Sequence, residues 1–261
     1  MAFLVTGGAG FIGSFLVRRL VDEEKVVVAM DIQLPRPLPR PLENITNRVI
    51  FVQGDVTDLT EVLRTIKEHK IEYVFHLAMG PTGADQPEEK PFKMLKVNVE
   101  GTANILEAAR LMDLKRVVYA SSAVVYGPAG LCREPVDEDT PPNPTTLYAA
   151  MKLFNEHLGL HYNTTFGVDF VALRFRLVYG PGRVNALGGV RGAGPVTTDI
   201  TPKIADFAVR GEPVTIKFGD QKYNWFYVKD CVRSLILACD ARNLKHRVFI
   251  VGGDTRTARE A

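Results

Sequence analysis

Cysteine is scarce in this chain, with three residues among 261, and Cys132, Cys231 and Cys239 lack the spacing of metal ligands. We therefore expect no metal site and no structural disulfide, which is typical of a reduced, intracellular protein. Cys231 and Cys239 fall on one helical pattern, so we interpret them as buried hydrophobic side chains.

The chain also lacks an excess of one charge and a long apolar run. Its 32 basic and 30 acidic residues leave a formal net charge of +2, which predicts neither a nucleic-acid nor a membrane partner. No apolar run approaches the length of a bilayer span, and glycines interrupt the apolar N-terminus, unlike a secretory signal. We expect a cytoplasmic protein with one large α/β domain, or one and a half domains.

A glycine-rich segment near the N-terminus, with Gly7, Gly10 and Gly13 three residues apart, joins a strand pattern to an amphipathic helix pattern. Residues 5 to 13 read Val-Thr-Gly-Gly-Ala-Gly-Phe-Ile-Gly, with a strand predicted over 2–6 and a helix over 11–21. The N–H groups and dipole of such a helix N-terminus favour a pyrophosphate, and each missing Cβ lets backbone approach closely. The pattern predicts a dinucleotide site at Gly7, Gly10, Phe11, Ile12 and Gly13.

An acidic residue follows the second predicted strand, 26–30, at the distance that a dinucleotide site requires. The Asp31 carboxylate is expected to accept hydrogen bonds from the adenosine ribose and to repel a 2′-phosphate, which favours NAD over NADP. Arg36 and Arg40 lie nearby and would suit a phosphate. Their Pro-rich surroundings indicate an extended, solvated loop instead.

Strand and helix patterns alternate along the first two thirds of the chain. Strands are predicted over 2–6, 26–30, 49–53, 72–78, 116–121 and 169–175, and helices over 11–21, 58–69, 91–112 and 146–162. This alternation predicts an α/β fold, a doubly wound parallel sheet of Rossmann type, with ligands at the carboxyl ends of the strands. Residues 1–176 would form the NAD-binding domain that also carries the catalytic residues.

The character of the sequence changes after Leu177. Residues 177–261 are interpreted mainly as a small substrate-binding subdomain, with 229–251 returning to the Rossmann core. Helices are expected over 201–210 and 229–239, and strands over 214–218, 223–228 and 247–251. Residues 257–261 look like the first turn of a further helix, so we expect missing C-terminal sequence.

Candidate catalytic residues follow the fifth strand and open the helix after it. The strand delivers Ser121 and Ser122 to the edge of the sheet, and Tyr148 and Lys152 share a face of the next helix. A nearby ammonium is expected to lower the pKa of the Tyr148 phenol, so that it can exchange a proton with a substrate hydroxyl or carbonyl. Ser122 would hold the same oxygen, and Lys152 would also bind the nicotinamide ribose.

Seven segments together resemble an extended short-chain dehydrogenase/reductase of the NAD-dependent epimerase/dehydratase type. They are Thr6–Gly13, Gly54–Asp58, His76–Ala78, Asn98–Thr102, Ser121–Gly127, Tyr148–Lys152 and Arg174–Gly182. The resemblance covers essentially the whole chain. It implies cofactor contacts from Asp55, Val56, Leu77, Ala78, Asn98, Ser121, Tyr148 and Lys152. It also implies a homodimer that pairs through the helices 91–112 and 146–162.

Several of these residues have simpler interpretations without the resemblance. Asp55 and Asp58 suit a turn and a helix N-cap, and His76 suits a buried histidine with satisfied hydrogen bonds. For Asn98, a structural role between helix and sheet stays open beside cofactor binding. Trp225 is interpreted as a core anchor rather than a sugar platform.

The chain departs from the resembling enzymes at three places. Sugar-nucleotide 4,6-dehydratases carry an Asp-Glu pair where Ala123 and Val124 stand here, which argues against that reaction. UDP-sugar epimerases usually bind the nucleotide-sugar phosphates with an Asn at the position of Leu177 and an Arg at that of Tyr223. Lys222, Arg183 or Arg191 would replace them, unless these are solvated loop charges. The expected substrate contacts are Met79, Ala123, Leu177, Arg183, Arg191 and Tyr223.

Three functions stay open at this point. The leading hypothesis is an NAD-dependent epimerase of a sugar or nucleotide-sugar, which transfers hydride transiently at a secondary alcohol carbon. The alternative is an NAD-dependent dehydrogenase of a non-nucleotide sugar, sugar acid or other secondary alcohol. A non-catalytic NAD sensor is a third hypothesis, which the presence of Ser122, Tyr148 and Lys152 disfavours.

Overall fold

The computed structural model describes residues 1–80, 91–127, 136–183, 207, 209–213, 220, 222–257, 259 and 260. Its strands are β1 (Ala2–Thr6), β2 (Val26–Asp31), β3 (Ile50–Gln53), β4 (Tyr73–His76), β5 (Arg116–Ser122), β6 (Phe170–Phe175), β7 (Leu177–Tyr179), β8 (Lys222–Tyr227), β9 (Val248–Val251) and β10 (Asp254–Thr257). Its α-helices are α1 (Phe11–Asp22), α2 (Leu59–Glu68), α3 (Pro91–Leu95), α4 (Gly101–Leu111), α6 (Leu147–Phe166) and α8 (Val228–Asp240). Two 3₁₀ helices, Arg40–Leu42 and η3 (Ala123–Tyr126), and the π-helix η2 (Lys96–Glu100) complete the described elements.

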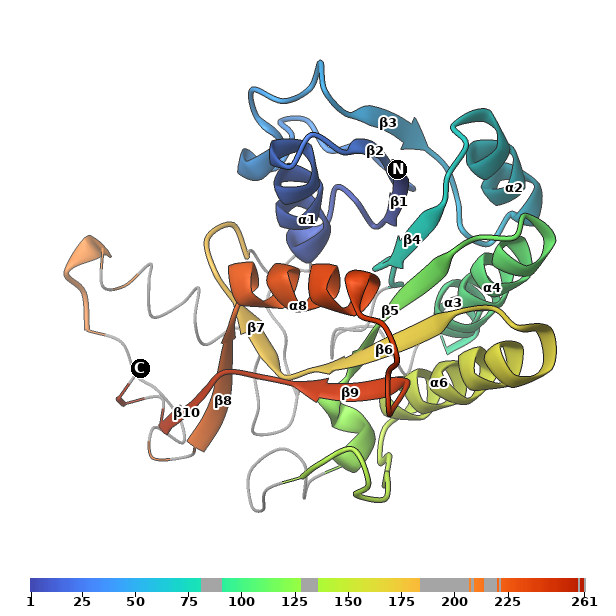
Figure 1. Ribbon diagram of the computed structural model, residues 1–261. Helices are drawn as coiled ribbons and strands as arrows, with labels where there is room; N and C mark the ends of the chain where they lie inside the picture. The colour runs from blue at the N-terminus through green and yellow to red at the C-terminus, as the bar shows by residue number, and fades with distance from the viewer. Residues whose placement is uncertain are drawn as a thin grey trace.

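Within the described residues, seven strands form one parallel sheet in the order β3-β2-β1-β4-β5-β6-β9. The chain winds outward from β1 to β3, then returns to β4 beside β1 and winds the other way (Figure 1). The strand order therefore reverses between β1 and β4, where a doubly wound sheet opens a crevice for ligands at its carboxyl ends. The predicted doubly wound parallel fold is confirmed.

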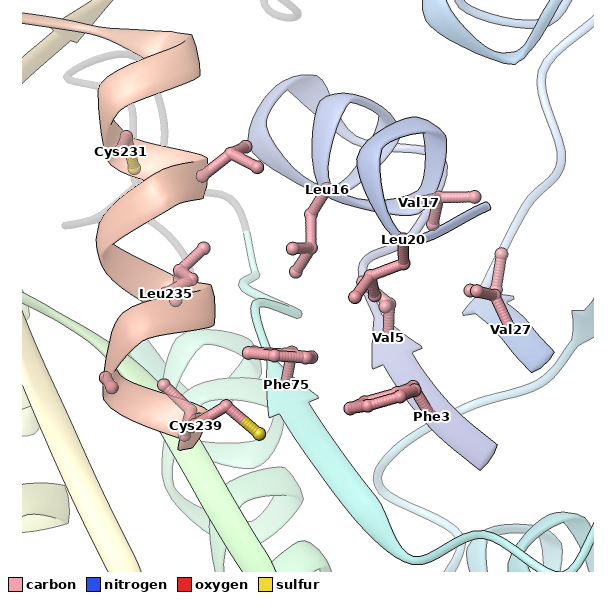
Figure 2. Packing of buried hydrophobic residues seen from close by; sticks show 14 of the residues in the cluster. Phe3, Val5, Leu16, Val17, Leu20, Val27, Phe75, Cys231, Leu235 and Cys239 are labelled. Carbon is pink, nitrogen blue, oxygen red and sulfur yellow. The ribbon is translucent and has the colours of Figure 1, made fainter. Parts of the chain in front are cut away.

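Helices cover both faces of this sheet because successive strand residues point to opposite faces. Phe3 and Val5 of β1 pack toward α1 and α8, whereas Leu4 of the same strand packs toward α2 and α4. Figure 2 shows the first face, where Leu16 of α1 and Leu235 of α8 meet above the sheet. This two-sided burial matches the continuous apolar runs that predicted the strands.

A second, three-stranded sheet lies beside the carboxyl end of β6, in the order β10-β8-β7 (Figure 1). Thr257 ends β10, where it pairs with Lys222 of β8, and its hydroxyl accepts the Glu260 N–H at 3.2 Å while the Glu260 carboxylate accepts the Thr257 N–H at 2.9 Å. This reciprocal pair is typical of a helix N-cap, in line with the expected turn. Tyr223 and Trp225 alternate inward on β8 and form a buried cluster with Leu177 and Tyr179 of β7. Trp225 also donates from Nε1 to the carbonyl of Arg256 at 3.1 Å, which supports its interpretation as an anchor.

The two helices predicted over 91–112 and 146–162 differ from these bounds in the structure. The predicted helix 91–112 consists of α3, the π-helix η2 and α4, so one extra residue enters its middle turn. The predicted helix 146–162 continues to Phe166 and ends at Gly167, which adopts the left-handed conformation at φ 74°. Thr146 begins it by accepting the N–H of Ala149 at 3.1 Å.

Arg116 ties α8 to the sheet. Its guanidinium donates to the carbonyls of Ala238, Cys239 and Ala241 at the C-terminal end of α8, at 2.8, 3.0 and 2.6 Å. The same group pairs with Asp169 at 2.7 Å. Carbonyls that the helix leaves unpaired are satisfied in this way by a buried cation. Among the described helices, none is long and apolar enough to cross a membrane.

Candidate active site

The glycine turn after β1 allows backbone contact that a side chain would block. Gly7 adopts φ +69°, and a Cβ there would lie 2.9 Å from the backbone of Leu77 and Ala78 after β4. At Gly13, a Cβ would lie 2.0 Å from the Gly7 carbonyl oxygen. Helix α1 therefore starts tight against the turn, at the point where the strand order reverses.

The N-terminus of α1 presents donors without a competing cap. Gly10 is the N-cap and supplies no side chain. Its carbonyl accepts the Ser14 N–H at 2.9 Å, while the N–H groups of Phe11, Ile12 and Gly13 have no acceptor among the residues the structure describes. Such N–H groups, together with the helix dipole, favour an anionic group. The predicted pyrophosphate contacts thus lie together at the crevice.

The end of β2 brings Asp31 beside this turn. Its half-buried carboxylate accepts the Ala9 N–H at 3.1 Å, so it also fixes the conformation of the glycine turn. Burial raises the pKa of Asp31, and backbone hydrogen bonds from Ala9, Gln33 and Ile32 oppose the rise.

Asp55 and Val56 follow β3, the next strand outward from β2. The Asp55 carboxylate accepts the Thr57 N–H at 2.9 Å, and Val56 is buried. Asp58 caps α2 by accepting the N–H groups of Thr60 and Glu61, which confirms its interpretation as an N-cap.

Asn98 lies in the π-helix η2 and is buried. Its Oδ1 accepts the Gly80 N–H at 3.0 Å just beyond β4. Its Nδ2 is fully buried and has no acceptor among the described residues, and the buried Oδ1 of Asn155 has no donor among them. The structural role predicted for Asn98 is therefore real, and one amide donor remains for a bound group. With the glycine turn, Asp31 and these donors, the residues present fit a dinucleotide.

The three predicted catalytic residues meet at the carboxyl end of β5. Ser122 ends β5, and its hydroxyl forms a hydrogen bond with that of Tyr148 on the first turn of α6. Lys152 lies one turn further on the same helix face, with Nζ 5.7 Å from the centre of the Tyr148 ring. Its ammonium donates to the Ala120 carbonyl at 2.6 Å and lies 4.6 Å from the Tyr119 ring centre.

The pKa values of this group correct one expectation. Burial raises the pKa of Tyr148 to about 12, although the Ser122 hydrogen bond and the charge of Arg183 act to lower it. Burial also lowers the pKa of Lys152 to about 7, against the opposing charge of Glu156. The predicted lowering of the Tyr148 pKa by Lys152 is therefore wrong for this structure, because desolvation disfavours both charged forms.

Arg183 joins the catalytic tyrosine to the glycine turn. Its guanidinium lies 5.5 Å from the Phe11 ring centre and donates to the Val178 carbonyl. The predicted residue Arg191 falls outside the described residues. The structure therefore places Arg183 at the start of α1.

A buried ion pair behind the catalytic residues was not predicted. Glu156, one turn after Lys152 on α6, accepts from the Arg174 guanidinium at 3.0 and 2.8 Å. It also accepts the hydroxyl of Ser121 at 2.5 Å, and Arg174 donates to the Tyr126 hydroxyl at 2.6 Å. Ser121 therefore faces this ion pair. The spacing of 148, 152 and 156 was the sequence signal, since such residues share a helix face.

The sequence profile of the NAD-dependent epimerase/dehydratase family matches residues 3–252 of the chain. The chain belongs to the NAD-dependent epimerase/dehydratase family. This confirms the resemblance, and it confirms an NAD-dependent enzyme and NAD as the cofactor at the level of the family.

Similar proteins include enzymes of two reaction types. A putative UDP-glucose 4-epimerase of Methanocaldococcus jannaschii is 32% identical over 256 residues, which cover 98% of this chain and 78% of that protein. The crystal structure of Thermus thermophilus UDP-glucose 4-epimerase with NAD has a TM-score of 0.82 at 31% identity, over 100% of this chain and 80% of that one. L-threonine dehydrogenase of Clostridium difficile has a TM-score of 0.83 at 26% identity, over 99% of this chain and 78% of that one.

The residues expected to contact the substrate lie on different elements, and some of them are buried while others are exposed. Leu177 and Tyr223 pack together around Trp225 in the second sheet, and Tyr223 is only 5% exposed. Ala123 is buried in η3, whereas Met79 follows β4 and is 48% exposed. Lys222 is exposed at the start of β8. Leu177 and Tyr223 thus belong to one apolar cluster with Trp225.

Proposed function

We propose that this protein is an NAD-dependent epimerase that inverts a secondary alcohol carbon of a sugar or nucleotide-sugar. The observation that carries the proposal is the hydrogen-bonded pair of Ser122 and Tyr148, with Lys152 one helical turn away, beside the glycine turn. The relatives named UDP-glucose 4-epimerase support this reaction class.

The residues that would hold NAD surround the crevice between β1 and β4. The N–H groups of Phe11, Ile12 and Gly13 would bind its pyrophosphate, and Asp31 its adenosine ribose. Val56, beside the Asp55 turn, and the backbone of Leu77 and Ala78 would line the remaining surface. NAD supplies the acceptor and donor for hydride when it is bound.

The chain itself supplies the proton transfer. The Tyr148 phenol is protonated at neutral pH, as its ordinary pKa of about 10 dictates and as burial reinforces, so its hydroxyl can donate to a substrate carbonyl oxygen. Taking a proton from a substrate hydroxyl requires the phenolate, and the Ser122 hydrogen bond and the charge of Arg183 act to stabilise that form. Ser122 would fix the substrate oxygen by hydrogen bonding to it and to Tyr148.

The substrate would lie between the sheet edge and the second sheet. We infer that residues 177–261 contribute mainly the substrate side, and that β9 returns to the NAD-binding sheet. Arg183 is the cation best placed to bind an anionic group of the substrate, because it lies at Phe11 and acts on Tyr148. This would supply part of the charge that Leu177 and Tyr223 cannot.

A dehydrogenase of a non-nucleotide alcohol is the second candidate. The apolar cluster that contains Leu177 and Tyr223 favours it, since neither side chain offers the amide or guanidinium that binds a nucleotide diphosphate. The likeness to L-threonine dehydrogenase is in line with such a reaction. The same Ser122, Tyr148 and Lys152 would serve both reactions.

The test begins with purified protein that is denatured and assayed for released NAD(H). Fresh protein is then incubated with UDP-sugars, free sugars, sugar acids and L-threonine, with NAD present, while NADH absorbance and product NMR are recorded. Inversion of a sugar carbon without accumulating NADH supports the epimerase. If NADH forms in proportion to an oxidised alcohol, the protein is a dehydrogenase and the epimerase proposal is rejected.

The matched control is Tyr148→Phe, which removes one hydroxyl and keeps the ring. We expect this variant to lose turnover by about 10²- to 10⁴-fold, the usual contribution of a positioned acid or base, and to bind NAD. A wild-type protein that binds NAD and converts no member of the panel would favour the non-catalytic sensor.

A further inference from the structure

A chain of buried hydrogen bonds passes through His76, between the glycine turn and the catalytic helix. His76 ends β4 directly opposite Thr6 of β1. Its Nδ1 lies 2.7 Å from the Thr6 hydroxyl, and its Nε2 lies 3.1 Å from the hydroxyl of Thr102 on α4. All three side chains are at most 2% exposed. These bonds are therefore shielded from competing water.

The surrounding bonds fix the tautomer of the ring. Thr102 donates its hydroxyl hydrogen to the Asn98 carbonyl at 2.7 Å, so it can only accept from His76, and Nε2 must carry a hydrogen. At the other end, the Thr6 oxygen accepts the Ala78 N–H at 3.3 Å and donates to Nδ1. Ala78 is one of the two residues whose backbone faces Gly7.

The series of hydrogen bonds continues from Thr102 through Asn98 and Asn155 to Tyr119, whose ring contacts Lys152. The Asn98 carbonyl also accepts from Asn155 Nδ2 at 2.7 Å, and the same nitrogen donates to the Tyr119 hydroxyl at 2.8 Å. Lys152 lies against the face of the Tyr119 ring, which itself stacks on His76 at 5.8 Å. The residues of this path belong to β1, β4, α4, η2, β5 and α6, so the path leads from the first strand to the catalytic helix.

We propose that neutral His76, as its Nε2–H tautomer, is a positioning residue that couples the cofactor turn at Gly7 and Ala78 to the placement of Lys152. The Thr6 side of the ring holds the Ala78 backbone, and the Thr102 side holds Asn98, Asn155 and Tyr119. This inference rests on the proposed function, because it assigns Lys152 and the Gly7 turn to one reaction.

The charges around the ring agree with a neutral state. Lys152 is the charged group that acts on His76 among the described residues, and the groups facing it from β1, α4 and β5 are hydroxyls and a ring. Burial, assisted by that cation, lowers the pKa of His76 to about 3. A proton on Nδ1 would also remove the acceptor to which the Thr6 hydroxyl donates its hydrogen.

Two substitutions separate the two sides of the ring. In His76→Asn, Oδ1 can replace Nδ1 as the acceptor for Thr6, but the side chain is too short to reach Thr102. In His76→Gln, Nε2 can replace the donor to Thr102, but the acceptor for Thr6 is lost. We expect H76N to lower kcat about tenfold and more than it lowers NAD affinity. H76Q should do the reverse, weakening NAD binding about tenfold, as the loss of one buried hydrogen bond predicts.

Val74→Ala is the matched control, because Val74 is buried on the same strand and makes none of these bonds. This variant should lower the denaturation midpoint and change kcat and NAD affinity by the same factor. If H76N and H76Q lose both properties in one ratio, as V74A does, the role of His76 is structural and the proposal is overturned. Unchanged kcat and NAD affinity in both variants would also overturn it.

Two NMR measurements need no substrate and therefore separate this inference from the proposed function. The ¹⁵N spectrum of the wild-type ring should show neutral His76 protonated at Nε2, and an Nδ1–H or doubly protonated ring would overturn the proposal. In H76N, the titration midpoint of Lys152 should rise toward its ordinary value, because looser packing of Tyr119 admits water. An unmoved midpoint in H76N contradicts the coupling, even if no substrate of the wild-type protein is found.

Discussion

Lys152 should make folding stability depend on pH in a way that its removal abolishes. Burial lowers its pKa from 10.5 to about 7, so between these values the unfolded chain carries a proton that the folded protein lacks. Stability therefore rises with pH across this window, by about 1.4 kcal/mol per pH unit, and the contribution levels off below pH 7. The full shift corresponds to about 5 kcal/mol.

Lys152→Met removes the titration and keeps an apolar stem of similar length. At pH 7 the variant should be more stable than the wild type, since it avoids the desolvated ammonium, although it loses the hydrogen bond to Ala120, worth about 1 kcal/mol. The difference should shrink by about 4 kcal/mol between pH 7 and pH 10, following about 1.4 kcal/mol per unit.

Urea denaturation of both proteins at pH 7, 8, 9 and 10 measures this difference directly. Other groups titrate in both proteins, so their contributions cancel in the comparison. A difference that stays constant over this range would refute the reasoning, because it would mean that Lys152 keeps its ordinary pKa in the folded protein.

Three further predictions follow from the structure. Gly13→Ala should abolish NAD binding in calorimetry, since its Cβ would lie 2.0 Å from the Gly7 carbonyl, whereas Gly10→Ala, with 3.1 Å to the same atom, should weaken binding less. Arg116→Lys loses the branched contacts with α8 and Asp169, so it should lower the free energy of unfolding by about 2 to 3 kcal/mol in urea denaturation. Its NAD affinity should stay unchanged, and an unchanged free energy of unfolding would contradict this prediction. If the chain pairs through α6, Phe154→Glu, at a side chain 52% exposed, should yield monomers in sedimentation velocity. Leu237→Glu, at a side chain 58% exposed on α8, should not, and equal behaviour of both variants would argue against that interface.

The sequence predicted the fold well because its apolar runs are long and regular. Val27 to Met30 and Phe170 to Phe175 are buried strand segments whose residues face both helix layers, so their composition leaves few other structures. The doubly wound parallel sheet followed from the alternation and from short connections, whereas the order of the strands within it was not predicted. The π-helix η2 was missed because its hydrogen-bond shift leaves the apolar spacing of residues 91–112 nearly unchanged.

The candidate site was predictable where residue type and spacing jointly demand one geometry. Gly13 is such a position, because its close approach to Gly7 excludes any side chain. The pKa of Tyr148 was not, since its direction depends on how far burial outweighs the nearby charges. Glu156 escaped prediction because a glutamate four residues after a lysine is also typical of a solvated helix face. Only the fold brings Arg174 against it.

The exposed apolar residues show the same limit of sequence patterns. Leu106, Leu111, Phe154 and Leu158 give the two helices of the expected dimer their apolar faces, which packing in the core would explain equally well. In the structure Leu106 is fully buried and Leu158 packs on the core, whereas Leu111 is 49% exposed and Phe154 52%. Helical spacing alone does not distinguish a core face from an interface.

The proposed reaction is tested most directly with UDP-glucose deuterated at C4, incubated with the purified protein and NAD. The account predicts the C4 epimer with its deuterium kept at the inverted carbon and no deuterated NADH in solution, because the hydride returns to the same substrate. Tyr148→Phe should give no product under the same conditions. Deuterated NADH released together with a ketone would contradict the epimerase and establish a dehydrogenase, and wild-type protein that leaves the sugar unchanged would contradict the proposal for this nucleotide-sugar.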